Sequence, residues 1–491
     1  MKASFILPVL LLASGCAAMS GERRGGERAA TSFFELPPAL QKDPSSLHVE
    51  PLQFEPPEPR IERLPNGMTV YLLPDRTVPL VQLHAVVTLG NLDDPPEKVG
   101  LTQVTWTTLQ TGGAGSRSAD EVDRTVEDMA ALVGAEAGDE NADLAMEFRA
   151  ADFERAMPLF LEMLRRPRFE PAALSRVLDQ GRDAVARRQD DAAHVAQVAF
   201  VQALWGVTSP FAREPTLETL AAIAREDLVA LHRRAVVPNA IRLVVTGDID
   251  ADAALQKIAA QVADWPAGTP TARKLPQPPA RKAREVIIVP TGGAQAKIRL
   301  GHLGLARHDP REYSVRLLDA ILGGGEGSSR LYTEIRDKRG LAYSVDSSIG
   351  PGPVKGLVLL AADTKPESAR EVIARCIEEM DAIRGARPPT EAEVAMAKEA
   401  AINAYAFRFD TAALAASMRA QSDQQGYPAD YFKTFRARLT AVSAEQVTAV
   451  AREILDPEAL EIVVVGDPDR IGDLSEYGPV RLLYGNSPPG E

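Results

Sequence analysis

The stretch Ile241-Arg-Leu-Val-Val-Thr-Gly-Asp-Ile-Asp250 has a near copy 219 residues later, at Leu460-Glu-Ile-Val-Val-Val-Gly-Asp-Pro-Asp469. Each copy is an apolar, β-branched run that ends in Gly-Asp, which is the pattern of a buried strand and its turn. The same offset aligns Pro238 with Pro457 and Glu226 with Glu445 in the stretches just before. A match across helix, proline and strand predicts two copies of one domain.

The duplication predicts the domain organisation of the chain. Its 491 residues exceed one ordinary core. A Pro-rich, basic stretch at 267–281 is the predicted linker between a first domain at 59–266 and a second at 282–485. Strand and helix patterns are mixed and hairpins are expected, so the predicted class is α+β, with a mainly antiparallel sheet and helices packed on one face in each domain.

Two signals in the first domain predict local structure. Asn66-Gly67 lies between apolar runs and predicts a tight hairpin with positive φ at both residues. The run from Leu80 to Leu89 alternates, with Val81 and Leu83 on one face and His84 on the other. This alternation predicts a sheet with one packed face and one partly wet face.

Composition restricts the class of protein. The 45% hydrophobic and 25% charged residues are typical of a soluble globular protein. The net charge of −13, without a basic block, argues against nucleic acid or an anionic membrane surface as a partner. Apart from Cys16 the only cysteine is Cys376, in an apolar helical pattern, so it is expected to be a buried small hydrophobe.

The N-terminal residues predict where in the cell the protein is located. Residues 1–16 contain Lys2, an apolar run and Ser14-Gly15-Cys16, which resembles a bacterial lipoprotein signal whose Cys16 is lipidated. An ordinary secretory signal with an incidental cysteine is the alternative. The polar, Pro-rich residues 17–58 predict a tether. We therefore expect a periplasm-facing lipoprotein of the cell envelope, held at the outer membrane by the lipid anchor only.

A glycine-rich block in the second domain carries the most specific signal: Leu322-Gly-Gly-Gly-Glu-Gly-Ser-Ser-Arg-Leu-Tyr-Thr-Glu-Ile-Arg336-Asp-Lys-Arg-Gly-Leu-Ala-Tyr343-Ser-Val345. Gly323 is expected to end one helix and Gly340 a second. Leu341, Tyr343 and Val345 are then expected on one face of a strand. The block is not a phosphate loop, because no Gly-Lys-Ser/Thr follows the glycines.

This block resembles the C-terminal signature of the insulinase or pitrilysin-type zinc peptidases, the family of the mitochondrial processing peptidase. The resemblance implies two α+β halves that enclose a peptide-sized chamber. It also implies that Arg336 and Tyr343 hydrogen-bond the backbone of a bound peptide near the zinc of the facing domain. The alternative reading is that Arg336 is a helix-surface charge and Tyr343 a core aromatic.

The metal half of the family site is missing from the sequence. The family places His-x-x-Glu-His on a helix, where this chain has Gln103, Trp106 and Thr107. An amide, an indole and a hydroxyl cannot hold Zn²⁺ or deprotonate its water, although the indole could fill the metal cavity. Asp179 and Asp183 are the acids nearest the expected third ligand and are interpreted as solvated charges. The six histidines are scattered. His84 could line a chamber, but a structural role is expected for a lone histidine.

We therefore predict a non-catalytic, substrate-binding subunit of a heterodimeric insulinase-type zinc peptidase. This chain has no predicted catalytic residue, metal or cofactor, and zinc is expected in a metal-bearing partner subunit. Two alternatives remain open at this point. One is a peptide-binding or scaffold protein with no associated peptidase, and the other is an autonomous hydrolase with a different metal arrangement.

Overall fold

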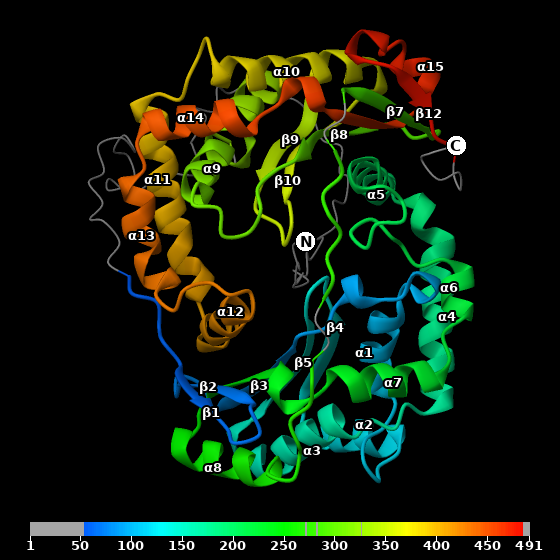
Figure 1. Cartoon of the computed structure of the whole chain (residues 1–491), viewed down its shortest axis with the longest axis vertical. Helices are drawn as coiled ribbons and strands as arrows, with labels where there is room; N and C mark the ends of the chain where they lie inside the picture. Colours follow the sequence, from blue (N-terminus) through cyan, green and yellow to red (C-terminus); the bar gives the residue numbers. More distant parts are fainter. Residues whose placement is uncertain (1–53, 271–272, 281–282, 326, 485–491) are drawn as a thin grey trace, which may run out of the picture. The chain divides into compact units, whose positions relative to one another are not determined.

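The computed structural model describes residues 54–270, 273–280, 283–325 and 327–484, and contains two six-stranded sheets that share the order of five strands (Figure 1). The first sheet has the order β1-β2-β6-β3-β5-β4. Its strands are β1 (Arg60–Arg63), β2 (Thr69–Pro74), β3 (Leu80–Val87), β4 (Leu132–Ala137), β5 (Ala142–Arg149) and β6 (Ile241–Gly247).

The second sheet has the order β12-β7-β11-β8-β10-β9 and repeats the first in all but its outer strand, because β12 pairs in parallel with β7 whereas β1 pairs antiparallel with β2. Its strands are β7 (Glu285–Pro290), β8 (Ala296–Leu303), β9 (Ala342–Ile349), β10 (Leu357–Thr364), β11 (Glu461–Gly466) and β12 (Val480–Leu482). The duplicated runs are β6 and β11. Each pairs in parallel with one neighbour and antiparallel with the other. The predicted α+β class and the tandem repeat are confirmed.

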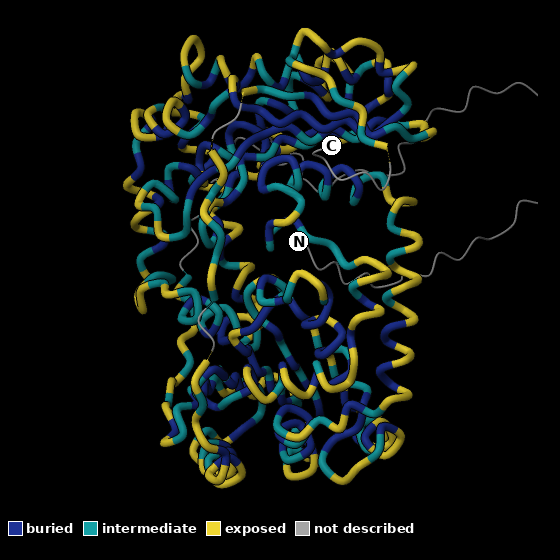
Figure 2. The backbone as a smooth tube through the Cα atoms, turned by 45° about the vertical axis from the view of Figure 1, so that its right-hand side comes forward, coloured by how far each residue is buried: buried dark blue, intermediate teal, exposed yellow. Residues whose placement is uncertain are grey.

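The helices follow the chain in the same two groups. The first half holds α1 (Leu101–Thr111), α2 (Ala119–Asp128), α3 (Phe153–Arg165), α4 (Pro171–Arg187), α5 (Ala192–Trp205), α6 (Leu217–Ala221), α7 (Arg225–Ala235) and α8 (Ala251–Gln261). The second holds α9 (Glu312–Asp319), α10 (Ala369–Arg384), α11 (Glu391–Ala406), α12 (Ala412–Gln424), α13 (Tyr431–Ala441), α14 (Ala444–Ile454) and α15 (Pro468–Ile471). Each half has its own large apolar core, and Figure 2 shows buried residues gathered in the interior of each half.

Each half also lends one helix to the other half's sheet. On β11, Ile462 and Val464 face the core of the second half, whereas Val463 and Val465 pack with α5 of the first half. Successive strand residues point to opposite faces, so α5 covers the face that the second half's own helices leave open. In the same way α12 packs Ala416 and Ala420 against Tyr71 and Val244 of the first sheet.

This exchange adds a contact to the strand predicted at residues 80–89. As predicted, one face of β3 is packed and the face that carries Gln82 and His84 is only partly buried. That second face also contacts α12, where His84 Nδ1 lies 2.8 Å from Ser417 Oγ. The imidazole Nε2 lies 2.8 Å from Asp143 Oδ1 on β5. His84 therefore joins β3, β5 and α12, which is the structural role expected for it.

The hairpin at Asn66-Gly67 forms with a longer loop than predicted. Arg63 pairs with Thr69, so residues 64–68 make the connection between β1 and β2. Only Gly67 has positive φ, at 88°, and the amide of Gly67 donates to Leu64 O. The prediction of positive φ at both residues was wrong, because this loop is longer than the two-residue turn that demands it.

Several predictions fall outside the described residues. The signal at 1–16, Cys16 and most of the tether at 17–58 lie there, and the domain boundaries stay predictions. At the described end of the tether, the rings of Phe54 and Phe409 have centroids 5.6 Å apart. The described part of 267–281 contains no helix or strand. Among the described helices, none has the length and apolar content needed to cross a membrane.

Candidate functional site

Helix α1 carries the three positions at which the family signature is absent. Its first turn is fixed by buried Asp94, whose carboxylate accepts hydrogen bonds from Gly100 N at 2.7 Å and from Thr102 N at 2.9 Å. Gly100 has φ 99°, a conformation open to glycine. Burial raises the pKa of Asp94, and the hydrogen bonds from Thr102 and Gly100 oppose this shift.

Gln103 and Thr107 hydrogen-bond to each other one helical turn apart. Gln103 Nε2 donates to Thr107 Oγ1 at 3.1 Å, and the Thr107 hydroxyl donates to the main-chain oxygen of Gln103 at 3.0 Å. Gln103 Oε1 also accepts from Ala137 N at 3.4 Å. These groups are neutral and already paired, so the pair does not form a ready metal site.

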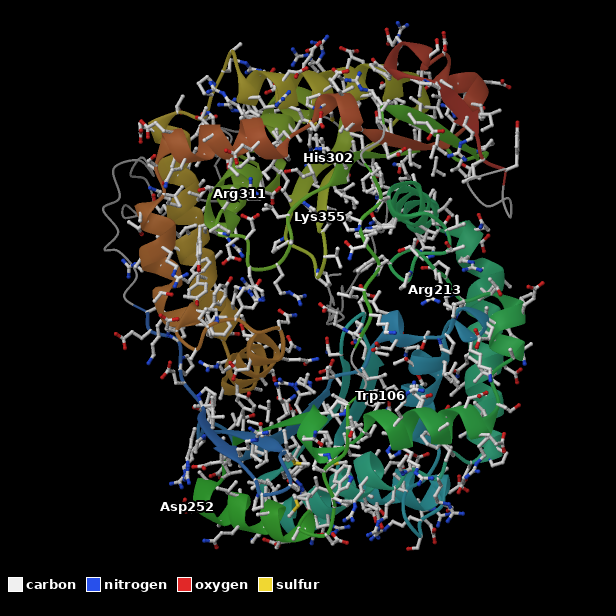
Figure 3. The ribbon with its side chains drawn as sticks, viewed as in Figure 1. Trp106, Arg213, Asp252, His302, Arg311 and Lys355 are labelled. Atoms are coloured by element: carbon white, nitrogen blue, oxygen red, sulfur yellow. The ribbon has the colours of Figure 1, made fainter. Side chains whose placement is uncertain are left out.

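Trp106 points the other way, into the core of the first half. Its side chain is fully buried, and the indole N–H donates to Asp143 O on β5 at 3.0 Å. Figure 3 labels it on α1. The hypothesis that this indole fills the metal cavity was wrong, because Trp106 does not line the cavity beside Gln103 and Thr107.

That cavity, here called the α1–α4 cavity, has a volume of about 400 Å³. Its lining from α1 is Gln103, Val104 and Thr107, and its lining from α4 includes Gly181 and Ala184. Asp179 and Asp183 do not line it, and Asp179 instead pairs with Arg182 at 2.7 Å on the exposed side of α4. Their interpretation as solvated charges agrees with this placement.

Histidines do not gather anywhere in the described chain. Among these residues, no group of three or more His, Cys, Asp or Glu side chains is arranged to hold a metal ion. His232 is half-buried with Nε2 2.8 Å from Leu164 O, and desolvation lowers its pKa. His302 Nε2 accepts from Asp456 N at 3.0 Å, so it too has a structural role.

The glycine run of the second half packs tightly against β9. A Cβ on Gly323 would lie 2.5 Å from Ser347 N, and one on Gly324 would lie 2.7 Å from Asp319 Oδ2. Glycine is therefore required by close packing, which agrees with the exclusion of a phosphate loop. Helix α9 continues into a π-helical turn, η8 (Ala320–Gly324), and the block's second helical segment is η9 (Tyr332–Asp337).

Asp319 anchors this turn to β9. Its Oδ1 accepts from Ser347 Oγ at 2.6 Å and from Ile349 N at 3.1 Å. Burial raises the pKa of Asp319 to about 7, and the hydrogen bonds from Ser347 and Ile349 oppose the shift.

Tyr343 lies at a β-bulge on the edge strand β9. Ser344 pairs with Asp363 and Ala342 pairs with Thr364, so the residue between them has no partner on β10. A bulge changes the direction of a side chain. Tyr343 is 61% exposed, whereas Val345 is buried. The prediction that Tyr343 and Val345 share one face was therefore wrong, and so was the alternative of a core aromatic.

Arg336 is exposed on η9 (Tyr332–Asp337), a π-helical segment that packs against β9. Its guanidinium carbon lies 4.8 Å from the ring centroid of Tyr332, a cation–π distance. Within the described chain no hydrogen bond joins Arg336 to Tyr343. Both polar groups are thus accessible on neighbouring elements, and their role in holding a peptide stays a prediction.

Sequence reasoning missed a protected sheet edge beside α1. Gln110 Nε2 donates to Val133 O at 2.9 Å, and its Oε1 accepts from Ala135 N at 3.1 Å. Both partners lie on β4, the edge strand of the first sheet. The side-chain amide thus pairs two main-chain groups that an edge strand would otherwise present to another chain. The signal in the sequence was the position of Gln110 seven residues after Gln103, which is about two helical turns and therefore on the same side of the helix.

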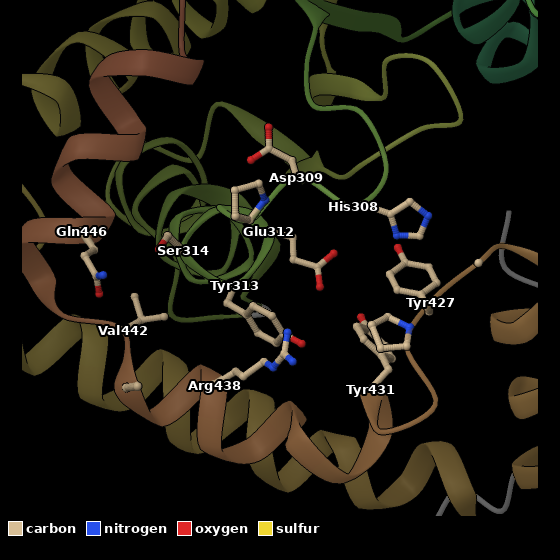
Figure 4. A pocket seen from close by; sticks show the side chains of 14 residues that line it. His308, Asp309, Glu312, Tyr313, Ser314, Tyr427, Tyr431, Arg438, Val442 and Gln446 are labelled. Carbon is tan, nitrogen blue, oxygen red and sulfur yellow. The ribbon is translucent and has the colours of Figure 1, made fainter.

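A second missed feature is a cavity of about 620 Å³ in the second half (Figure 4). Glu312 lines it together with Tyr313, Tyr427 and Tyr431, and burial raises the pKa of Glu312. Arg438 lines the same cavity, so its lining carries both signs of charge. The walls come from segments more than 100 residues apart, which no local pattern reveals.

Comparison with protein families gives two matches. Residues 69–208 match the insulinase family, peptidase family M16, and residues 222–401 match the peptidase M16 inactive domain. Together these matches span more than half of the chain. The second contains Arg336 and Tyr343.

Individual relatives match parts of this chain at low sequence identity. An uncharacterized zinc protease of Streptomyces coelicolor is 31% identical over 34% of this chain and 37% of the relative. One of Mycobacterium leprae is 28% identical over 56% of this chain and 64% of the relative. The chain thus matches less than two thirds of either relative. The non-peptidase homolog YmxG of Helicobacter pylori is 26% identical over 45% of this chain and 51% of the relative.

Solved structures share the fold. A peptidase M16 inactive domain from Pseudomonas fluorescens superposes with a TM-score of 0.77 at 23% identity, over 84% of this chain and 98% of that one. The periplasmic protease PqqL of Escherichia coli superposes with a TM-score of 0.70 at 17% identity, over 86% of this chain and 48% of that one.

Proposed function

The chain belongs to the insulinase family, peptidase family M16, and on that premise we propose that it is the non-catalytic, substrate-binding subunit of a heterodimeric zinc peptidase. The observation that carries the proposal is the contrast between the two halves of the chain: the first lacks metal ligands and the second keeps the substrate-binding residues of the family signature. Helix α1, which carries the metal-binding imidazoles in the family, has a hydrogen-bonded Gln103–Thr107 pair in their place. The second half keeps Arg336 and Tyr343 exposed on adjoining elements.

The exposed pair has the chemistry to hold a peptide backbone. A guanidinium offers several N–H donors to main-chain oxygens, and a phenol can donate or accept one hydrogen bond. The bulge at Tyr343 turns its ring outward from an edge strand. The proposed partner is a family member with an intact His-x-x-Glu-His, and it would supply the zinc and the base.

The proposed site of action is the cell envelope, on peptide substrates. Support comes from the lipoprotein-like signal ending at Cys16 and from the described fold, which is shared with the periplasmic protease PqqL. In this proposal the lipid on Cys16 holds the chain at the outer membrane, and residues 17–58 place the folded part in the periplasm.

A reconstitution experiment tests the proposal. The purified full chain is mixed with a metal-bearing paralogue, and cleavage of a peptide library is measured with each protein alone and with both. Activity is expected only in the mixture, and Arg336→Ala or Tyr343→Phe should lower it about tenfold or more. Tyr484→Phe is a matched control, because Tyr484 is also 61% exposed. Unchanged turnover in both site variants would contradict the proposal.

The same experiment separates the alternatives. Peptide binding that depends on Arg336, without turnover in any mixture, would favour a peptide-binding or scaffold protein. Cleavage by the single chain, together with one equivalent of zinc by elemental analysis, would favour the autonomous hydrolase.

A further inference from the structure

Two cavities meet beside the altered metal helix. The α1–α4 cavity adjoins a second cavity of about 710 Å³, here called the α5 cavity. Both are lined by Arg188, His194 and Glu214, so these three side chains stand at their junction. A volume of this size is typical of sites for small organic ligands.

The walls of the α5 cavity are mainly apolar. Helix α5 contributes Val195, Val198 and Ala199, and the second half contributes Val289 and Leu483. Two glutamines and three threonines also line the cavity (Gln189, Gln202, Thr208, Thr216 and Thr219), but most of its surface is apolar. The main chain of a peptide would leave amide groups without partners against this apolar surface. An unbranched hydrocarbon chain needs no partners and gains from burial there.

The lining of this cavity includes a cation with an incomplete set of hydrogen-bond partners. Arg213 donates from Nη2 to the main-chain oxygen of Asp94 at 2.9 Å, and its Nε is buried without a hydrogen-bond partner. Within the described chain no carboxylate oxygen lies within 4.0 Å of its guanidinium. The carboxylates of Asp94 and Glu97 act on it only at longer range. Figure 3 labels Arg213 in the first half.

The junction does not neutralise this charge. Glu214 is shared by Arg188 at 3.6 Å and by His194 at 3.5 Å. The single carboxylate already faces one guanidinium and one imidazole. The charged side chains that line the two cavities therefore favour an added anion over an added cation.

We propose that the α5 cavity binds a fatty acid, with its carboxylate on Arg213 and its hydrocarbon chain along Val195, Val198 and Ala199 toward Leu483. Charge complementarity selects the head group and the apolar walls select the chain. The site goes beyond the proposed function and does not depend on it, because it uses neither Arg336 nor Tyr343.

Calorimetric titration of the full chain with dodecanoate, below its micelle concentration, tests the proposal. Saturable binding of one equivalent is expected. Arg213→Met keeps the volume and removes the charge, and should weaken binding about tenfold or more. Dodecanol should bind the unmodified chain about as weakly as dodecanoate binds that variant. Arg213→Lys keeps the charge and should retain most of the affinity.

Two further variants make the test specific. Val198→Trp fills the cavity and should abolish binding while circular dichroism stays unchanged. Arg225→Met is the matched control, because Arg225 also donates to main-chain oxygens, those of Phe169 and Arg168, and lies outside both cavities. Equal affinity for dodecanol and dodecanoate, full affinity in Arg213→Met, or tighter binding of a leucine-terminated peptide would overturn the proposal.

Discussion

Trp106 donates its indole N–H to the main-chain oxygen of Asp143 across 3.0 Å, from helix α1 to strand β5. The family places a glutamate base at this position, where a carboxylate must face the metal. In this chain the side chain faces the core of the first half instead and is fully buried. Trp106 therefore stabilises the fold. Replacing it with the glutamate of the family would place a charged carboxylate in the core.

Trp106→Ala should lower the free energy of unfolding by about 3–5 kcal/mol, because it removes a large buried side chain and leaves a cavity. Urea titration followed by circular dichroism measures the change. Leu132→Ala is the control, since Leu132 is 70% exposed on β4 and its truncation should change the value by less than about 0.5 kcal/mol. Similar midpoints for both variants would contradict a core role for Trp106.

Restoring ligands around the α1–α4 cavity should restore metal binding without activity. Gln103→His and Thr107→His place two imidazoles one turn apart, and Ala184→Glu adds a carboxylate from the facing wall. The triple variant should bind one equivalent of zinc by elemental analysis. Hydrolysis should stay absent, since Trp106 still occupies the position of the base.

The position of the third ligand can be checked separately. Asp183 precedes Ala184 but does not line the cavity, so Asp183→Glu with the same two histidines should bind zinc at least about tenfold more weakly. Equal zinc affinity in the two triple variants would show that α4 does not face the altered site as described.

Much of the fold follows from the sequence, because the repeat is carried by local patterns. The runs at 241–250 and 460–469 are apolar on both faces, and they form the strands β6 and β11 inside their sheets. The exchange of α5 and α12 between the halves could not be predicted. An alanine-rich helix such as α12 does not reveal which sheet it covers, and its partners Tyr71 and Val244 are far away in the chain.

The candidate site was predicted in part. The loss of imidazoles at Gln103 and Thr107 is visible in the sequence, whereas the direction of Trp106 depends on the distant strand β5. Period-two alternation placed Tyr343 beside Val345, because a bulge has no signature in a pattern that assumes an unbroken strand. No role was predicted for Arg213, because the lack of a hydrogen-bond partner for its buried Nε is a property of the folded structure.

Asp319 should make stability fall as pH rises. Its pKa is about 7 in the folded chain, against an ordinary value of 3.8. Below about pH 4 the carboxyl is neutral in both states, and between about pH 4 and 7 only the unfolded chain releases the proton. Its contribution to stability should therefore decrease by roughly 1.4 kcal/mol per pH unit in that window, and stay constant above it.

Asp319→Asn should remove this dependence. Relative to the unmodified chain, the variant should become more stable by about 2 kcal/mol between about pH 5 and pH 7. Urea titrations at the two pH values measure the difference. Asp183→Asn, on the exposed side of α4, controls for the change in net charge and should show no such trend. A pH-independent difference for Asp319→Asn would contradict the raised pKa.

Gln110 should protect the edge strand β4 from exchange with solvent. Its amide pairs Val133 O at 2.9 Å and Ala135 N at 3.1 Å, so Gln110→Ala leaves both main-chain groups unpaired. Hydrogen exchange measured by NMR should be at least about tenfold faster at Ala135 N in the variant, because a hydrogen bond of about 1–2 kcal/mol is lost there. Amides of β11, far inside the second sheet, should keep their rates. An unchanged rate at Ala135 would mean that the edge is protected by something other than this side chain.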